Sequence, residues 1–328
     1  MRFSPLLRAR WITALLLPLA TFTCRAAVVV TQAASDGSTG DSSFTLGAHW
    51  DDGLAPHSGA DYVSSLTIRT PASSGSQTFG GDSLTLNSGG TLTFKGTGTT
   101  PPTITVHNLT LNTGSTVTSQ VGRPFTLAGN IILNAGNIGT FQVTTPTNFG
   151  FSISATIAGE GALRFTTSYT SQTDSDRAVT LRASNTFSGG STINTFTSVI
   201  AASDGAFGTG NVTMNGGNLT FQSGLLNDYI ASTGKFILSS TIANFSINLN
   251  FSGIDDIGGL SLDGGTTYLS PHTYSVTELN TLYGSEVFVG TGQLNVVPEP
   301  GAIGPVTVAA ALLLLGRFRR KSSGFFAA

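Results

Sequence analysis

The fold of this chain is decided by one stretch, Ser83-Leu84-Thr85-Leu86-Asn87-Ser88-Gly89-Gly90-Thr91-Leu92-Thr93-Phe94. Apolar residues alternate with Ser or Thr on both sides of a central Asn-Ser-Gly-Gly. Alternation with a period of two predicts a β-strand that buries one face. Asn and Gly supply the positive φ angles of a tight bend. The stretch therefore predicts a strand, a turn and a second strand.

The same pattern returns along the chain, in Asn108–Val117, Asn130–Ile138, Asn211–Phe221 and, in a weaker form, Gly259–Leu269. The first three copies begin 25 and then 22 residues apart. A period in the low twenties is typical of a solenoid, in which one coil cannot bury its apolar face alone and stacked coils share a core.

We therefore predict an all-β fold, a right-handed parallel β-helix (solenoid) with a short N-terminal signal helix and a C-terminal transmembrane helix. The alternative is a β-sandwich, which would place strands every 8–12 residues or so without a longer repeat. The repeat region spans 81–258, between an N-terminal β cap region at 28–80 and a C-terminal β cap at 259–296. We also expect stacked Asn side chains at the corners.

Two further predictions concern Trp50 and the segment Tyr274–Leu282. An isolated Trp between two β runs usually plugs the end of a core, so we expect Trp50 to do so. The segment Tyr274–Leu282 has the composition of a short helix, with Thr277 as its predicted cap.

Charge and cysteine content exclude several classes of function. Residues 27–300 hold seven basic side chains against all 17 acidic ones, and this acidic balance argues against nucleic acid as a partner. The only cysteine is Cys24, so the body of the chain has neither disulfides nor thiolate chemistry.

Residues 1–27 have the three parts of a secretory signal peptide. Arg residues come first, an apolar core follows at Trp11–Leu19, and small residues at Ala26 and Ala27 mark the cleavage region. We therefore expect the chain to be exported.

The C-terminal segment, residues 297–321, combines a proline kink, an apolar run and a basic stop. Pro298, Glu299, Pro300 and Gly301 precede the run Ala302–Gly316, which would span roughly 22 Å as a helix, short of a ~30 Å bilayer core. Four basic residues follow it: Arg317, Arg319, Arg320 and Lys321. By the positive-inside rule they would keep the end of the chain cytoplasmic, so we expect a transient membrane anchor followed by a tail at 322–328.

This order of features resembles the PEP-CTERM sorting domain of Gram-negative bacteria, whose pattern is Pro-Glu-Pro, a short apolar helix and a basic cluster. The resemblance implies recognition by exosortase, a membrane transpeptidase-like enzyme, removal of the tail, and delivery to the cell surface or extracellular matrix. Ser322–Ala328 extends past the point where the family pattern ends.

A second resemblance lies in Leu181–Ile193 and Gly205–Val212, which are similar to the autotransporter-associated β-strand repeat. That pattern is Asn-Thr-aromatic-x-Gly-Gly-x-Thr-x-Ile, followed by a Gly-rich turn and another strand. The resemblance implies a β-helical, passenger-like structure and no activity.

Candidate catalytic groups are few. Asp174 with Asp176 beside Arg177, and Asp255 with Asp256, are the only pairs that suggest carbohydrate chemistry, and His49 with Asp51 and Asp52 could suggest a metal or acid/base site. Each is better explained as a solvated turn. We predict no catalytic, cofactor or metal site, and leave Ca²⁺ binding by the acidic body open.

Two functions follow from these observations. The first is a non-enzymatic structural or adhesive protein of an extracellular polysaccharide matrix, with an exosortase-type enzyme and exopolysaccharide as partners. The alternative is a carbohydrate-active β-helix enzyme, a lyase or glycosidase.

Overall fold

The structure is a computed structural model that describes residues 27–37, 42–97, 100–119, 123–144, 150–170, 177–240 and 245–298. The predicted signal helix and the predicted transmembrane helix at 302–316 lie outside these residues. Within the described ranges, no helix has the length and hydrophobicity needed to cross a membrane.

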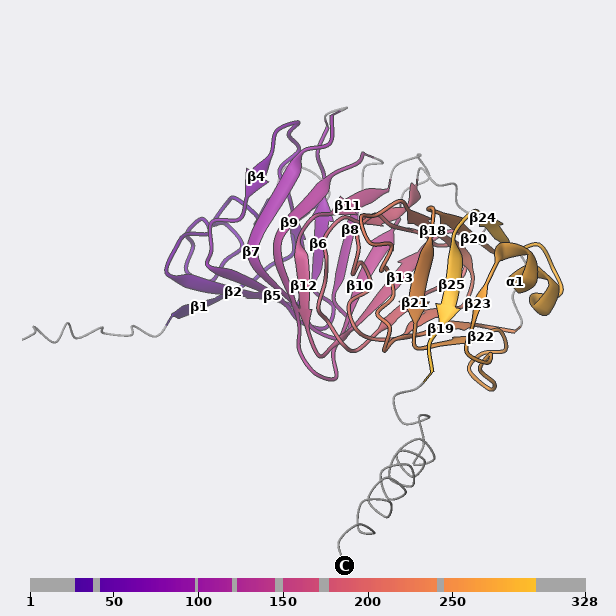
Figure 1. The fold of residues 1–328 in the computed structure, drawn as a ribbon. Helices are drawn as coiled ribbons and strands as arrows, with labels where there is room; N and C mark the ends of the chain where they lie inside the picture. Colours follow the sequence, from indigo (N-terminus) through magenta and orange to yellow (C-terminus); the bar gives the residue numbers. More distant parts are fainter. Residues whose placement is uncertain are drawn as a thin grey trace, which may run out of the picture.

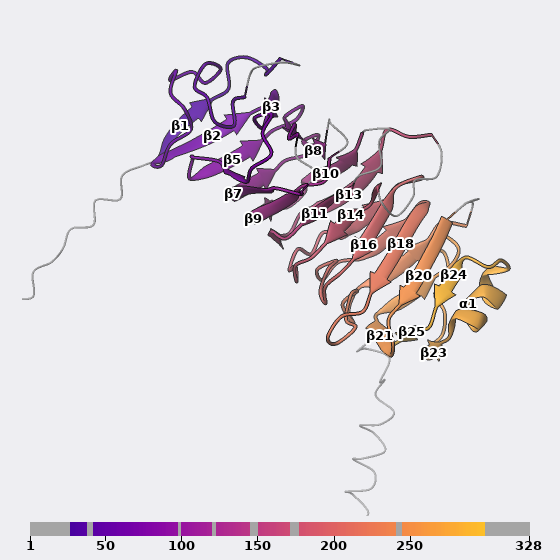
Figure 2. The same cartoon turned by 90° about the horizontal axis from the view of Figure 1, so that it is seen from above.

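Two parallel sheets run the length of the molecule (Figures 1 and 2). The larger sheet holds β1 (Val28–Thr31), β2 (Ala60–Ser64), β4 (Gln77–Thr78), β5 (Ser83–Leu86), β7 (Thr103–Leu111), β9 (Thr126–Leu133), β11 (Phe151–Ile153), β12 (Thr156–Gly159), β14 (Val179–Leu181), β16 (Ser198–Ala201), β18 (Gly217–Gln222), β20 (Phe245–Asn250) and β24 (Phe288–Gly290). The smaller sheet holds β3 (Thr67–Arg69), β6 (Thr91–Phe94), β8 (Thr116–Ser119), β10 (Ile138–Val143), β13 (Ala162–Thr167), β15 (Ser191–Ile193), β17 (Val212–Met214), β19 (Lys235–Leu238) and β22 (Gly259–Ser261).

The chain alternates between the sheets, and each strand pairs in parallel with strands of the neighbouring turns. This arrangement is a β-solenoid of about eight turns, which confirms the prediction of an all-β solenoid. The β-sandwich alternative is wrong, because hairpins would give antiparallel pairs and the pairs described in both large sheets are parallel. The right-handed sense stays a prediction, which the handedness rule for parallel crossovers favours.

The core consists of inward-pointing side chains stacked in register from turn to turn. One column along the smaller sheet is buried throughout: Ile68, Leu92, Val117, Phe141, Phe165, Ile193, Met214 and Leu238. Burying each such side chain contributes roughly 1.5–3 kcal/mol. The repeat thus stacks one apolar position on the next.

The corners of the solenoid are joined by side-chain amides. Asn112 donates to Asn87 at 2.8 Å and Asn137 donates to Asn112 at 3.1 Å, which confirms the predicted ladder. Asn185 lies in the segment Leu181–Ile193 and is buried. It bridges three turns, because its Oδ1 accepts from the Ile157 amide and its Nδ2 donates to the Ala206 carbonyl. The Asn185 side chain therefore links its own turn to the preceding and the following one by hydrogen bonds.

An aromatic plug closes the N-terminal end of the core. Trp50 is buried and packs edge-on against Tyr62, with ring centroids 4.7 Å apart, while Phe79 contacts Phe44, Trp50 and Tyr62. This confirms the prediction that Trp50 plugs the end of the core.

The C-terminal end is closed by a third sheet and a helix. The sheet holds β21 (Ile254–Ile257), β23 (His272–Tyr274) and β25 (Gln293–Val296), and the helix is α1 (Val276–Tyr283). The predicted helix is confirmed, but Thr277 is the wrong cap. Ser275 is the N-cap, since it accepts from the Glu278 amide while the Glu278 carboxylate accepts from the Ser275 amide.

Strands of the solenoid continue into the segment predicted as a separate C-terminal cap. Within 259–296, β22 pairs with β19 in the smaller sheet and β24 pairs with β20 in the larger one. The last turn and the cap therefore share this segment.

Candidate functional site

Asp255 and Asp256 do not form a carboxylate pair. They lie in strand β21 rather than in the predicted turn, and side chains alternate between the two faces of a strand. Asp255 is buried, whereas Asp256 is exposed and its Oδ1 accepts from Asn295 Nδ2 at 2.8 Å. The two carboxyl groups therefore face opposite sides, and they cannot act together across one bound sugar.

The Asp255 carboxyl is held in the interior. Its Oδ1 accepts from the Tyr229 amide at 3.3 Å, and its Oδ2 is buried with no hydrogen-bond partner among the described residues. Burial raises the pKa of Asp255 well above its usual value, and the negative charge of Asp228 raises that pKa further. This carboxyl is therefore neutral well above the pH at which an exposed aspartate ionises.

The other predicted pair, Asp174 with Asp176, lies outside the described residues. The described chain resumes at Arg177, whose guanidinium lies 5.1 Å from the centre of the Tyr169 ring.

His49 is paired with a residue that the sequence did not single out. Its Nδ1 lies 2.8 Å from Oδ1 of Asp36, which is buried, and not beside Asp51 or Asp52. Asp36 also accepts from the amides of Ser43 and Arg69 and from the Ser43 hydroxyl. The Ser43 proton is thus directed to the carboxylate and not to the imidazole, so this cluster fastens the N-terminal cap and does not activate a nucleophile.

Across the described ranges there is no group of three or more His, Cys, Asp or Glu side chains that could hold an ion.

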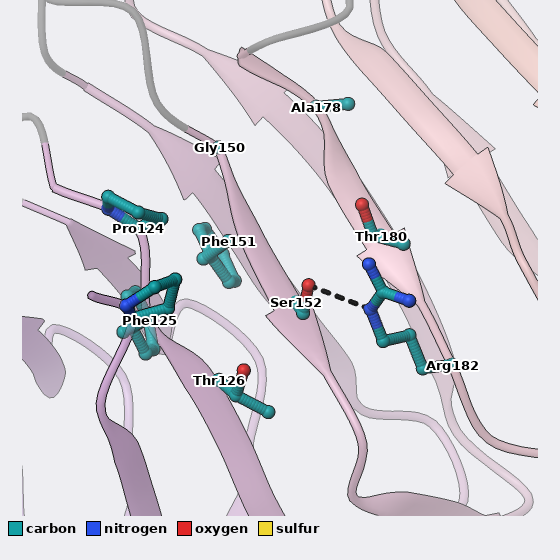
Figure 3. A pocket seen from close by; sticks show the side chains of 10 residues that line it. Pro124, Phe125, Thr126, Gly150, Phe151, Ser152, Ala178, Thr180 and Arg182 are labelled. Atoms are coloured by element: carbon teal, nitrogen blue, oxygen red, sulfur yellow. Dashed lines mark hydrogen bonds between the residues drawn. The ribbon is translucent and has the colours of Figure 1, made fainter. Parts of the chain in front are cut away.

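A groove of about 330 Å³ lies on the outer face of the larger sheet, over β9, β11 and β14 (Figure 3). Three hydroxyl side chains line it: Thr126, Ser152 and Thr180. They are in register, because Ser152 is paired with Thr126 on one side and with Thr180 on the other. Neighbouring strands are about 4.8 Å apart, so the three hydroxyls form an evenly spaced row, in which Thr126 and Ser152 are half-buried and Thr180 is buried.

Arg182 supplies the only charged side chain among the described residues that line the groove. It follows β14 and is exposed, and its Nε donates to Ser152 Oγ at 3.0 Å (Figure 3). None of the ion pairs found between described residues includes Arg182. Among the described residues, the Arg182 guanidinium beside the hydroxyl row is therefore not neutralised by a carboxylate.

Apolar groups form the rest of the groove. Phe125 and Phe151 are buried and stack on each other with ring centroids 4.7 Å apart, and Pro101 and Pro124 complete one wall. Gly150 lets two turns approach closely, since a Cβ at this position would lie 1.7 Å from the Ala178 carbonyl oxygen.

The chemistry of this lining suits binding better than hydrolysis. Among the described residues around the groove there are hydroxyls, a guanidinium and apolar rings, whereas glycoside hydrolysis by the usual route uses a pair of carboxyl groups. Sequence reasoning missed this site. Thr126, Ser152 and Thr180 are 26 and then 28 residues apart, which is outside the 22–25 residue repeat that the motif marks.

A second hollow of about 360 Å³ lies over the smaller sheet. It is lined by glycine-rich turns and hydroxyls at 188–192, 209–211 and Thr213, with no charged side chain among them. These residues could form hydrogen bonds with a ligand, but none of them carries a charge that would favour a charged ligand over a neutral one.

The predicted targeting residues lie at the two ends of the described chain. Ala27 and Pro298 are both exposed, and β1 begins one residue after Ala27 while β25 ends two residues before Pro298. Outside the described residues are Ala26, Glu299, Pro300, Gly301, Arg317, Arg319, Arg320 and Lys321.

Comparisons with known proteins found no matching family model, no matching curated protein and no matching solved structure.

Proposed function

We propose that this chain is an exported, non-enzymatic β-solenoid, sorted through Pro298–Lys321 to the cell surface or the extracellular polysaccharide matrix, where it has a structural or adhesive role. The proposal includes a signal peptide cleaved at Ala26–Ala27, a transient inner-membrane intermediate, and an exosortase-type enzyme that removes the tail.

The position of the solenoid between the two motifs carries this proposal. The strands run from Val28 to Val296, and the last backbone bond of the C-terminal sheet joins the Val297 amide to the Ile257 carbonyl at 2.9 Å. Cleavage at Ala26–Ala27 and at the Pro-Glu-Pro motif would leave every strand and both end caps whole. A processing site inside the fold would not.

The groove supports a binding role. Its hydroxyl row and guanidinium are suited to holding a polar chain, and Asp255 and Asp256 face opposite ways and do not supply the alternative enzyme with a carboxylate pair.

The sorting step is tested by replacing Pro298, Glu299 and Pro300 with alanine in the native host. We expect the tail to be retained, as measured by mass spectrometry, and the protein to stay in the inner-membrane fraction. Alanine at Ser322 and Ser323, beyond the motif, is the matched control and should be processed normally. Unchanged processing and delivery of the triple variant would show that the motif is not a sorting signal.

A further inference from the structure

We infer that the groove over β9, β11 and β14 binds an acidic polysaccharide by its uronate carboxylates, with Arg182 as the residue that recognises the charge. This inference rests on the proposed role in a polysaccharide matrix and names the class of sugar.

Charge along the chain is strongly segregated. Residues 28–82 hold one basic and six acidic side chains, and residues 183–300 hold one basic and eight acidic ones. Residues 83–182, which include the groove, hold five basic and three acidic side chains. A polyanion is therefore repelled by both ends of the solenoid and attracted to its middle turns.

Arg182 is placed to receive a carboxylate there. Its Nε is engaged by Ser152, which fixes the side chain across the hydroxyl row and leaves the terminal amino groups of the guanidinium beside Ser152 and Thr180 (Figure 3). A planar guanidinium can bind a carboxylate through two parallel hydrogen bonds, and such charge-assisted bonds are about twice as strong as neutral ones.

The remaining lining matches the rest of a sugar ring. Thr126 and Ser152 are half-buried, so their hydroxyls can donate to ring hydroxyls, whereas Thr180 is buried and contributes less. Pro101 and Pro124 offer apolar surface to C–H groups. The hydroxyl row follows the stacking direction of the strands, so a glycan would lie along the solenoid axis.

The test is glycan binding by the full-length chain purified in a non-ionic detergent. The probes are oligomers of polygalacturonate, dextran sulfate as a sulfated polyanion, and neutral dextran, titrated by calorimetry at fixed ionic strength. We expect the polyuronate to bind, neutral dextran not to bind, and added salt to weaken the binding.

Arg182→Gln should raise the Kd for the polyuronate about tenfold or more, because it removes a charge-assisted pair. Arg182→Lys keeps the charge without the planar fork and should give an intermediate Kd. Ser152→Ala frees the guanidinium and should cost about three- to tenfold. Arg164→Gln is the matched control, since Arg164 is an exposed arginine in the other large sheet, and it should change the Kd by less than about twofold.

Several results would overturn the inference. Equal weakening by Arg182→Gln and Arg164→Gln would indicate non-specific attraction, and tighter binding of dextran sulfate would assign the groove to sulfate. Absence of polyuronate binding to the unaltered chain would also refute it, and thermal melting confirms that each variant is folded. The export proposal has its own readout in tail processing, so either idea can fail without the other.

Discussion

The side-chain amide of Asn112 donates a 2.8 Å hydrogen bond to Oδ1 of Asn87, one turn earlier in the solenoid, and its Oδ1 accepts from Asn137 one turn later at 3.1 Å. Such a ladder joins neighbouring turns independently of the sheets. All three side chains are partly buried, so water cannot fully replace the lost bonds.

We expect Asn112→Ala to lower the free energy of unfolding by about 2 kcal/mol, because it breaks two inter-turn bonds worth roughly 1 kcal/mol each. Urea denaturation followed by circular dichroism would measure it. Asn250→Ala is the control, because Asn250 is exposed at the end of β20. A loss as large in Asn250→Ala would show that the ladder has no special role.

The buried column of the smaller sheet gives a second prediction. Phe141 is fully buried and lies between Val117 and Phe165, and its ring stacks on Phe165 with centroids 5.9 Å apart. Phe141→Ala should cost about 3–5 kcal/mol through lost burial and a cavity shared by three turns. Its neighbour Thr140 points outward, so Thr140→Ala should cost less than about 0.5 kcal/mol in the same denaturation experiment. If both variants lost a similar amount of unfolding free energy, the conclusion that Phe141 points inward and Thr140 outward would be contradicted.

Gly150 gives a third prediction, on both stability and the groove. An alanine there would place its Cβ 1.7 Å from the Ala178 carbonyl oxygen, so the two turns must move apart. We expect Gly150→Ala to destabilise the fold by about 1–3 kcal/mol and to weaken glycan binding.

Gly75→Ala is the matched control for Gly150→Ala. The nearest atom to a Cβ at Gly75 is the Ser73 hydroxyl, 3.9 Å away, and we expect almost no change. Melting temperature and polyuronate affinity report the two effects separately. An unaltered melting temperature for Gly150→Ala would show that the turns are less closely packed at this point.

The sequence predicted the architecture because every turn of a solenoid repeats a similar pattern of apolar, polar and turn residues. The alternation of Leu84, Leu86, Leu92 and Phe94 with polar residues sets both strands of a turn, and the period between copies identifies stacking. Trp50 was predictable as a plug because it is an isolated Trp between two β runs, ahead of the first copy of the repeat. These features depend on local pattern and spacing.

The groove could not be predicted in the same way. Its hydroxyls come from turns of unequal length, and strands as short as β11 and β14 carry too little alternation to fix which residues face each other across turns. The pairing of His49 with Asp36 was missed for a related reason. The two residues are 13 apart in a cap that has no repeats, so no periodic pattern indicates that they are neighbours. The prediction therefore paired His49 with the nearer Asp51 and Asp52.

Asp255 gives the last prediction, which concerns pH. Its folded pKa is raised well above the value of about 3.9 that it has in the unfolded chain, because the carboxyl is buried and the negative charge of Asp228 opposes its ionisation. The protonated form therefore favours folding. This stabilisation is complete below the unfolded pKa and is lost as the pH rises through the folded pKa.

Asp255→Asn should remove this dependence, since an amide keeps the shape and cannot ionise. We expect the variant and the unaltered chain to melt at similar temperatures near about pH 4. As the pH is raised to about 8, the unaltered chain should lose stability, so that the variant becomes progressively more stable than the unaltered chain. Asp256→Asn, on the exposed face of the same strand, should largely keep the pH dependence, because the charge of Asp256 is the weakest of the influences that raise the pKa of Asp255. If Asp255→Asn instead melted below the unaltered chain at the higher pH, the carboxyl would have to be ionised and paired in the folded state. A bound cation would then be the first partner to test, by repeating the melts with Ca²⁺ and with a chelator.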